Sequence, residues 1–387
     1  MSMNPTVLFV AVTPYQILIS YVIASCIKHE KICDLVSSCA YDQANEIAKK
    51  LSVFKEVSTI SKRRTPVKGG KLRSFLGEKD LIKKAKQIFE HYTPNTVVVF
   101  KDGSPLEATF IKCAHSKNAN VTLIEEGLAI YSKDIIDTES ISYKSKNIIK
   151  KLLGYPPTFP GQGNNPAVQI ISAFHDEMLP ADKKINRTVV PFPTVSPPTN
   201  ILDSFVNDLS LSASCKPGPD GIKNNNIIYL GQPLSELGIV TAEKEYNFLK
   251  KLFYLINRQG FKLTVKPHPW DHRKKYSMFR VEVYEGNHIP AEAIVHILKP
   301  DFILTPYSSA GHTSSAWFNA RVMFLYPLLD INLDPEISKL LLSEKGTNTI
   351  AASWNDIEEF LKMKSISQKR DTSIDSLSFY EYSKKIT

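Results

Sequence analysis

A histidine between two prolines is the first feature of the sequence that could do chemistry. His268 stands in the stretch Val-Lys-Pro-His-Pro-Trp at 265–270, at the end of the apolar run 261–265. The prolines keep the backbone extended and carry no amide hydrogen, so the imidazole is directed while the chain around it is stiff. Since an imidazole has a pKa of about 6.5, it could bind a phosphate as a cation or donate a proton to a leaving group. A purely structural histidine is the alternative.

Small hydroxyl residues follow another apolar run, at 301–305. Ser308 and Ser309 stand where a helix would begin. There they could offer backbone amides, hydroxyl donors and the positive end of the helix dipole to an anion. A plain helix cap is the alternative for the serines taken alone. Because His268 and the serines both follow strand-like runs in the same half of the chain, together they predict a phosphate site.

Two carboxylates occupy the corresponding place in the first half of the chain. Glu125 and Glu126 directly follow the apolar run 121–124 and precede a glycine that permits a turn. A carboxylate opposite a phosphate site could take the proton from a sugar hydroxyl. A favourable charge at the start of a helix is the alternative.

Strand-like and helical stretches alternate around these residues. Residues 6–12 are β-branched and aromatic, and Thr13 and Gln16, at the turn into the next helix, could reach ligand hydroxyls. This alternation predicts an α/β chain with parallel sheets covered on both faces, and such sheets bind ligands beyond the carboxyl ends of their strands. The strands are expected within 6–12, 96–100, 121–124, 226–234, 261–265, 301–305 and 322–326.

Stretches rich in Pro, Gly, Ser and Asn divide the chain. They begin at Gly154 and recur at 189–200 and 212–226, and a chain of 387 residues is long enough for two domains. We predict two Rossmann-like parallel-sheet domains with a cleft between the carboxyl ends of their sheets. The expected parts are an N-terminal domain at 1–190, a linker at 191–222, a C-terminal domain at 223–355 and a helical or polar tail at 356–387. The tail would either pack back on the first domain or lie against the inner membrane.

The net charge of +9 comes largely from two basic stretches, at 61–86 and 143–153. They are either solvated faces or surfaces that attract anionic lipid headgroups or an anionic glycan. We expect no nucleic-acid partner, because the basic runs are not interleaved with stacking aromatic residues. The opening stretch 1–12 lacks a basic signal-peptide region, so we expect a cytoplasmic protein, peripheral at the inner face of the cytoplasmic membrane.

Several phosphate and metal motifs are absent from the sequence. It contains no G-x-x-x-x-G-K-[ST], no G-x-G-x-x-G, no H-E-x-x-H and no D-x-D. We therefore expect a phosphate site made of helix ends, hydroxyl groups and a histidine, without a metal ion.

The combination of motifs resembles bacterial sialyltransferases of the lipooligosaccharide sialyltransferase and capsule polysialyltransferase groups. The likeness rests on Glu125-Glu126-Gly127, His268-Pro269 and Ser308-Ser309, in that order. The stretches Thr-Pro-Tyr-Gln at 13–16 and Tyr-Leu-Gly-Gln-Pro-Leu at 229–234 are also similar, and the resemblance spans roughly 6–326.

The resemblance implies a GT-B glycosyltransferase that inverts the sugar and needs no metal. The enzyme would move sialic acid, or a related nonulosonic acid, from CMP-sialic acid to a hydroxyl of a surface glycan such as lipooligosaccharide, O-antigen or capsule. The N-terminal domain would face the acceptor, a lipid-linked glycan, and supply the general base. Glu125 is the first candidate for this base and Glu126 the second. His268 would stabilise or protonate the departing CMP phosphate. Glu292 would contact the ribose hydroxyls, unless it is simply an exposed first-turn glutamate.

The binding residues that the resemblance implies divide between the two substrates. On the donor side they are Gln232, Lys266, Pro269, Glu292, Ser308 and Ser309, and on the acceptor side or in the cleft Thr13 and Gln16. The donor substrate is the only nucleotide compound expected, with no further cofactor. A single phosphate suits a histidine and a few hydroxyls, and a base on the opposite face of the sugar gives inversion.

Three other functions remain open. A CDP-glycerol glycerophosphotransferase would share the histidine and serine signals, but usually carries an acidic residue just before the serines, where this chain has Thr305-Pro306-Tyr307. A UDP-sugar transferase or epimerase of similar fold is the second. The third is a non-catalytic glycan-binding protein, against which the three intact motifs argue.

Overall fold

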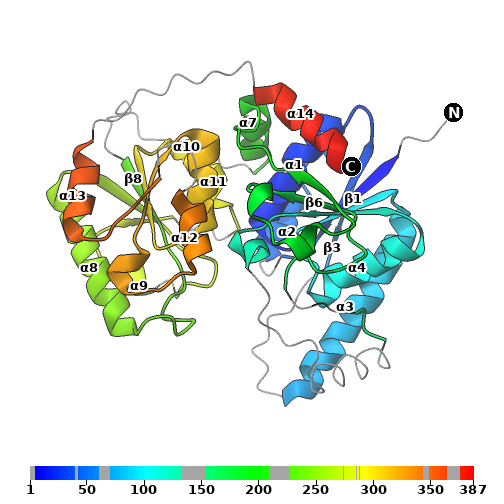
Figure 1. Cartoon of the computed structure of the whole chain (residues 1–387), viewed down its shortest axis with the longest axis horizontal. Coiled ribbons are helices and arrows are strands. Elements are labelled where there is room, and N and C mark those ends of the chain that lie inside the picture. The colour runs from blue at the N-terminus through cyan, green and yellow to red at the C-terminus, as the bar shows by residue number, and fades with distance from the viewer. Residues whose placement is uncertain are drawn as a thin grey trace. The chain divides into compact units, whose positions relative to one another are not determined.

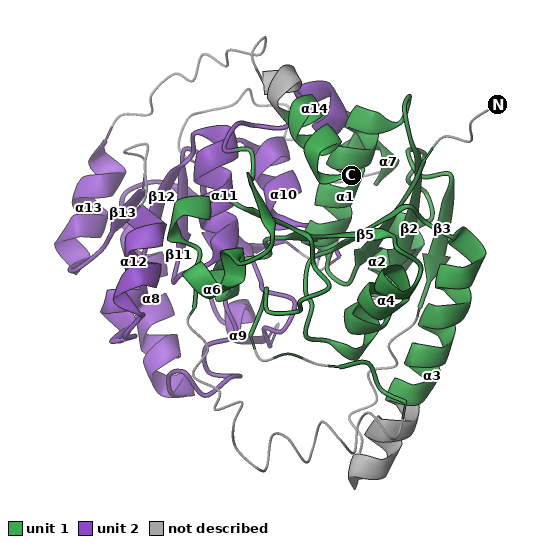
Figure 2. Cartoon of the chain, turned by 45° about the vertical axis from the view of Figure 1, so that its right-hand side comes forward, with its two compact units in different colours: residues 1–193, 203–209, 374–387 green, residues 194–202, 210–373 purple. Residues whose placement is uncertain are grey.

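The computed structural model of the chain shows two compact units (Figures 1 and 2). Unit 1 comprises Met1–Pro193, Asp203–Leu209 and Ile374–Thr387, and unit 2 comprises Thr194–Leu202 and Ser210–Ser373. The structure describes residues 5–39, 42–60, 70–132, 154–157, 159, 161–209, 226–272, 274–284, 286, 288–342, 348–363 and 375–387.

Unit 1 is built on a seven-stranded parallel sheet. The strand order is β3-β2-β1-β4-β5-β6-β7. Its elements are β1 (Thr6–Ala11), α1 (Pro14–Ile27), β2 (Ile32–Ser37), α2 (Asp42–Ala48), β3 (Glu56–Thr59), α3 (Gly70–Tyr92), β4 (Thr96–Val99), α4 (Pro105–Ser116), β5 (Asn120–Ile124), the 3-10 helices η1 (Leu128–Tyr131) and η2 (Asp176–Met178), β6 (Ile170–Ala173), α6 (Ala181–Lys184), β7 (Thr188–Pro191) and α14 (Asp375–Ile386).

The last helix, α14, belongs to unit 1 although it follows all of unit 2 in the chain. It packs against α1 and β7 (Figure 1). Phe379 is fully buried, the Tyr382 hydroxyl lies 2.8 Å from Ser172 Oγ, and Thr96 Oγ1 donates to the carbonyl of Thr387 at 2.7 Å. Of the two places expected for the C-terminal tail, this helix occupies the one on the first domain.

Unit 2 contains a six-stranded parallel sheet in the order β10-β9-β8-β11-β12-β13. The helix α7 (Thr199–Asp208) lies where the chain passes between the units, within the segment expected as a linker. The elements of unit 2 are β8 (Asn226–Leu230), α8 (Ala242–Arg258), β9 (Lys262–Lys266), α9 (Lys274–Ser277), β10 (Glu282–Val283), α10 (Ala291–Leu298), β11 (Phe302–Thr305), α11 (Ser309–Phe318), β12 (Arg321–Phe324), η3 (Tyr326–Leu329), α12 (Pro335–Leu342), β13 (Asn348–Ile350) and α13 (Trp354–Lys362).

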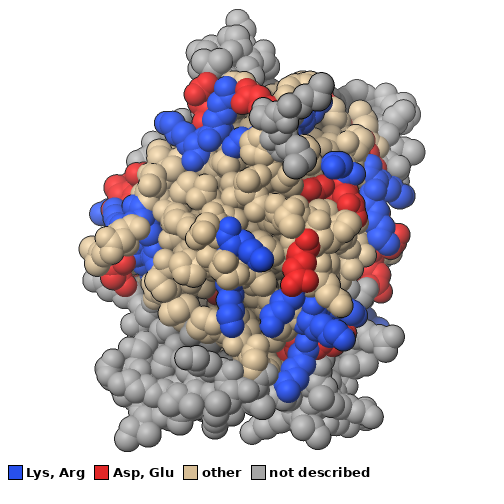
Figure 3. Space-filling model, turned by 90° about the vertical axis from the view of Figure 1, so that its right-hand side faces the viewer, with Lys and Arg blue, Asp and Glu red and all other residues tan. Residues whose placement is uncertain are grey.

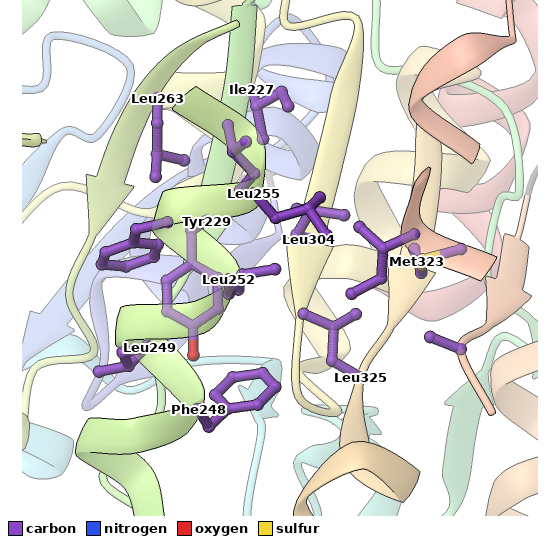
Figure 4. Packing of buried hydrophobic residues seen from close by; sticks show 14 of the residues in the cluster. Ile227, Tyr229, Phe248, Leu249, Leu252, Leu255, Leu263, Leu304, Met323 and Leu325 are labelled. Carbon is purple, nitrogen blue, oxygen red and sulfur yellow. The ribbon is translucent and has the colours of Figure 1, made fainter. Parts of the chain in front are cut away.

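Helix α8 shows how the sequence builds this unit. Thr241 caps it by accepting a hydrogen bond from Lys244 N, and Gly260, at a φ of 78°, ends it. Its buried face packs on the sheet, and Figure 4 shows Leu252 beside Tyr229 and Leu304. Burying one such leucine stabilises the fold by about 2 kcal/mol.

The fold class predicted from the sequence is confirmed: both units are parallel sheets with helices, each resembling a Rossmann domain. Each strand expected from an apolar run is present. The strands β2, β3, β6, β7, β10 and β13 were not predicted.

The surface and the helices bear on the predicted membrane contact. Among the helices of the described residues, none has the length and apolar character that crossing a bilayer requires. Of the two basic stretches, 143–153 and the part of the first at 61–69 lie outside the described residues. On the face drawn in Figure 3, Lys and Arg are interspersed with Asp and Glu, and a broad described area carries neither.

Candidate active site

In unit 1, three neighbouring strands end at one edge of the sheet. Strands β1, β4 and β5 are adjacent, and their register pairs Val10 with Val99 and Val99 with Leu123. Their carboxyl ends are therefore level. Thr13, Lys101 and the acidic pair follow them.

Both carboxylate oxygens of Glu126 contact groups from the neighbouring strand ends. Its Oε1 accepts a hydrogen bond from Thr13 Oγ1 at 2.7 Å, and its Oε2 lies 3.0 Å from Lys101 Nζ. Gly127 follows at a φ of 77°, a conformation that favours glycine. Glu126 thus joins the three strand ends by polar contacts.

Glu125 points into the protein and is only 5% exposed. Its Oε2 accepts hydrogen bonds from the Tyr131 hydroxyl and from Phe174 N, the latter at 2.7 Å. Burial raises the pKa of Glu125 from 4.5 to about 7, although these two hydrogen bonds act in the opposite direction. A carboxylate with such a pKa is a stronger base than an exposed glutamate.

Thr13 and Gln16 shape the turn between β1 and α1. Thr13 caps α1 by accepting a hydrogen bond from Gln16 N at 3.3 Å. Gln16 is fully buried, and its Oε1 accepts from Val12 N at 2.6 Å. Its Nε2 has no hydrogen-bond partner among the described residues. The two residues flank the acidic pair, but their contacts are with protein groups.

In unit 2, His268 lies in a tight turn directly beyond β9. The backbone N–H of His268 donates to Asp271 Oδ2 at 2.8 Å, and its backbone carbonyl accepts from Asp271 N at 2.9 Å. Trp270 N donates to the ring atom Nδ1 at 3.1 Å. Because Nδ1 is an acceptor, the neutral ring carries its hydrogen on Nε2.

Electrostatics keep this imidazole neutral at pH 7. Burial is the largest effect, and with the positive charges of Lys266 and Lys275 it lowers the pKa of His268 from 6.5 to about 4, against the opposing charge of Glu236. In this state His268 is a hydrogen-bond donor through Nε2 rather than a cation. An anion bound beside the ring would raise its pKa again.

Asp271 is held by its own set of donors. Tyr276 hydroxyl donates to Oδ2 and Lys275 Nζ to Oδ1, at 2.8 and 2.7 Å. Lys275 also donates to Gln232 O at 3.0 Å. A Cβ at Gly231 would collide with the Tyr276 hydroxyl and lie 2.6 Å from Asp271 Oδ2, so this position requires glycine.

The serines and Gln232 stand at the same edge of the unit 2 sheet as His268, since β9, β8 and β11 are neighbours. Ser308 caps α11, with its Oγ accepting from Ala310 N at 3.2 Å, and Ser309 is the first residue of that helix. Gln232 Oε1 accepts from Tyr307 N at 2.9 Å. Gln232 therefore fixes the loop that carries the serines.

Of the remaining predicted donor residues, Lys266 and Pro269 lie within two positions of His268 in the chain, and Glu292 belongs to α10. Lys266 ends β9, is 5% exposed, and donates through Nζ to Pro267 O at 3.3 Å. Pro269 is half-buried in the His268 turn. Glu292 lies in the first turn of α10 and is 3% exposed, so the alternative of an exposed glutamate is wrong.

Four groups that support these sites were missed at the sequence level: Lys101, Tyr131, Asp271 and the N–H of Phe174. Asp271 had a usable signal, because a carboxylate three residues into a turn can reach back to the N–H of the first residue, as in a capping box. Phe174 is 49 residues from Glu125, and only the pairing of β5 with β6 brings them together.

One comparison decides the family. The sequence model of the alpha-2,8-polysialyltransferase (POLYST) family matches residues 7–326. The chain belongs to this family. It is therefore a glycosyltransferase, a sialyltransferase that uses a nucleotide-sugar donor and a glycan acceptor, and the predicted resemblance is confirmed. No curated protein matches the chain.

Solved structures show the fold of this polysialyltransferase-family chain. UDP-GlcNAc 2-epimerase from Neisseria meningitidis is 16% identical, with a TM-score of 0.55 over 98% of this chain and 94% of that one. The UDP-GlcNAc 2-epimerase from Methanocaldococcus jannaschii in complex with UDP-GlcNAc and UDP is 12% identical, with a TM-score of 0.55 over 96% of this chain and 97% of that one. UDP-N-acetylglucosamine 2-epimerase from Rickettsia bellii is 13% identical, with a TM-score of 0.56 over 99% of this chain and 95% of that one. At such identities the likeness supports the GT-B architecture, and the family match favours transfer of sialic acid over epimerisation.

Proposed function

We propose that the enzyme transfers sialic acid, or a related nonulosonic acid, from CMP-sialic acid to a hydroxyl of a surface glycan, with inversion and without a metal ion. The observation that carries the proposal is the strand-end site of unit 2. A neutral imidazole with its N–H on Nε2 stands at the same sheet edge as the amino terminus of α11. Both are donors suited to one phosphate group.

On the donor side, the bond between sialic acid C2 and a phosphate oxygen of CMP breaks, and negative charge develops on that oxygen. His268 would donate to it through Nε2, as a hydrogen bond or with transfer of the proton. Ser308, Ser309 and the amides of the first turn of α11 would hold the other phosphate oxygens. Lys266 would add positive charge, while Gln232, Pro269 and Glu292 would shape the site for the nucleoside.

On the acceptor side, the acceptor oxygen forms the new bond to C2 and gives its proton to a carboxylate. We assign this base to Glu125, whose pKa of about 7 suits proton transfer at neutral pH. Glu126 is the second candidate, because it is more exposed. Thr13, which is half-buried next to this pair, would contact the acceptor, and the fully buried Gln16 would support the turn that carries it.

The finer biological setting belongs to the same proposal. The acceptor would be lipid-linked, and the enzyme cytoplasmic, at the inner face of the membrane. The basic stretches would then contact anionic headgroups.

Calorimetry with CMP, CDP and UDP in the presence of EDTA tests the donor assignment. Selective binding of CMP without metal supports it, whereas a preference for CDP or UDP would mean a different donor. His268→Ala should weaken CMP binding at least tenfold. His272→Ala, in the same loop, is the matched control, because His272 uses its backbone N–H, not its ring, to contact Glu236.

Turnover of Glu125→Gln and Glu126→Gln tests the base. We expect Glu125→Gln to lose a factor of about 10³ in kcat while still binding CMP. If Glu126→Gln shows that loss and Glu125→Gln does not, the base is Glu126. If neither loses activity, the acidic pair has no catalytic role.

A further inference from the structure

The hydroxyl of Tyr131 bonds to the proposed catalytic base. We infer that Tyr131 is a positioning residue, which fixes the orientation of the Glu125 carboxylate and the pH range in which it accepts a proton. The inference rests on the proposed function, in which Glu125 is the base.

The hydrogen bonds of the Tyr131 hydroxyl have a defined direction. Its oxygen accepts the N–H of His175 at 3.0 Å, so its own hydrogen is available for Glu125 Oε2, to which it donates. Phe174 N donates to the same oxygen at 2.7 Å. Two donors therefore converge on Oε2, and Oε1 accepts no hydrogen bond within the described residues. Oε1 is the oxygen left to take a proton from an acceptor.

The backbone around Tyr131 is held in place by a buried lysine. Lys183 is fully buried, and its Nζ donates to the carbonyls of Ile130 and Ser132, at 2.9 and 3.0 Å. These carbonyls flank Tyr131, which is itself 6% exposed. Because the main chain is fixed independently of the hydroxyl, removing that oxygen should leave the ring in place.

Other titratable groups surround the carboxylate. His175 follows β6, and its Nδ1 lies 3.4 Å from Glu177 Oε1. Tyr382 of α14 bonds to Ser172 and lies within electrostatic reach of Glu125. The Glu126–Lys101 ion pair is next to it in the chain. Tyr131 and Phe174 are the groups that the structure shows bonding to the Glu125 carboxylate. Loss of the hydroxyl should therefore act on the ionised carboxylate directly.

The test is the pH dependence of kcat/KM with CMP-sialic acid and an acceptor. In Tyr131→Phe the ionised carboxylate loses a hydrogen-bond donor, so the acidic limb of the profile should shift to higher pH by roughly one to two pH units. Activity lost at pH 7 should recover at higher pH. Tyr92→Phe is the matched control, since it removes a hydroxyl of similar burial that bonds to Ser58 elsewhere in unit 1.

A purely structural role would lower kcat/KM by the same factor at every pH, and that result, or an unchanged profile, would overturn the inference. If Tyr131→Phe does not fold, a fluorinated tyrosine at 131 gives the answer. Its more acidic hydroxyl is the stronger donor, so the acidic limb should move down, and no movement rejects the inference.

The Glu125→Gln variant separates this inference from the proposed function, in which Glu125 is the base. If that variant stays active, the base assignment fails and the inference with it. If Glu125→Gln is inactive while the Tyr131→Phe profile coincides with that of the unaltered enzyme, only the role of Tyr131 fails.

Discussion

Glu125 should make the folded protein less stable as the pH rises. Burial raises its pKa from 4.5 to about 7, so the folded protein holds this proton more tightly than the unfolded chain does. The stability contributed by the proton is fully present below pH 4.5 and is lost as the pH rises through about 7. The difference between the two pKa values corresponds to about 3 kcal/mol.

Replacing Glu125 by glutamine removes this loss, because the amide does not ionise. At pH 8 the free energy of unfolding of unit 1 should be about 3 kcal/mol higher in Glu125→Gln than in the unaltered protein. Below pH 4.5 the gain should disappear. The variant would therefore be more stable and inactive, as expected where a site retains a destabilising group for function.

Urea unfolding at several pH values measures this difference. The three tryptophans, Trp270, Trp317 and Trp354, all belong to unit 2, so their fluorescence reports that unit, while circular dichroism reports both. Glu46→Gln, at an exposed glutamate of α2, is the control and should change stability by less than about 0.5 kcal/mol. A difference that does not vary with pH, or a less stable Glu125→Gln at pH 8, would refute the reasoning.

Further predictions concern the donor site and the C-terminal helix. Gly231→Ala should displace Asp271 and Tyr276 and so weaken CMP binding at least tenfold by calorimetry; unchanged affinity would show that the His268 turn tolerates a side chain there. His268→Gln, whose amide can replace the Nε2–H donor, should bind CMP within about threefold of normal. It should nevertheless lose at least a hundredfold in kcat if the ring transfers a proton; a near-normal kcat would mean that hydrogen bonding alone suffices. Phe379→Ala should destabilise unit 1 by about 3 to 4 kcal/mol. Circular dichroism during urea unfolding would show this loss, while the tryptophan fluorescence transition of unit 2 should stay unchanged. A shift of the tryptophan transition alone would contradict this prediction.

The sequence predicted those parts of the site that local chemistry determines. Prolines fix the backbone at His268 whatever the rest of the fold does, and a serine before a helix caps it wherever the helix lies. Apolar runs of β-branched residues likewise identify the central strands. These features depend on residues within a few positions of one another, so a single sequence reveals them.

The surroundings of Glu125 were missed because they depend largely on contacts between distant segments. Its carboxylate accepts the N–H of Phe174, 49 residues away, and the neighbouring Ser172 bonds to Tyr382, which is 210 residues further along the chain. No local pattern marks such pairs, because they follow from the order of strands in the sheet and from the return of α14. The sequence therefore predicted that a glutamate would stand at the strand end, but not that it would be buried with a raised pKa.

The return of α14 to unit 1 also has a consequence for biosynthesis. Thr96 and Thr122 donate to the carbonyls of Thr387 and Ile386, residues that the ribosome adds after the whole of unit 2. The unit that carries the proposed base would therefore remain open on one side while unit 2 is being translated. We expect unit 2 to be able to fold first, and the acidic pair to reach its final environment only after α14 has left the exit tunnel.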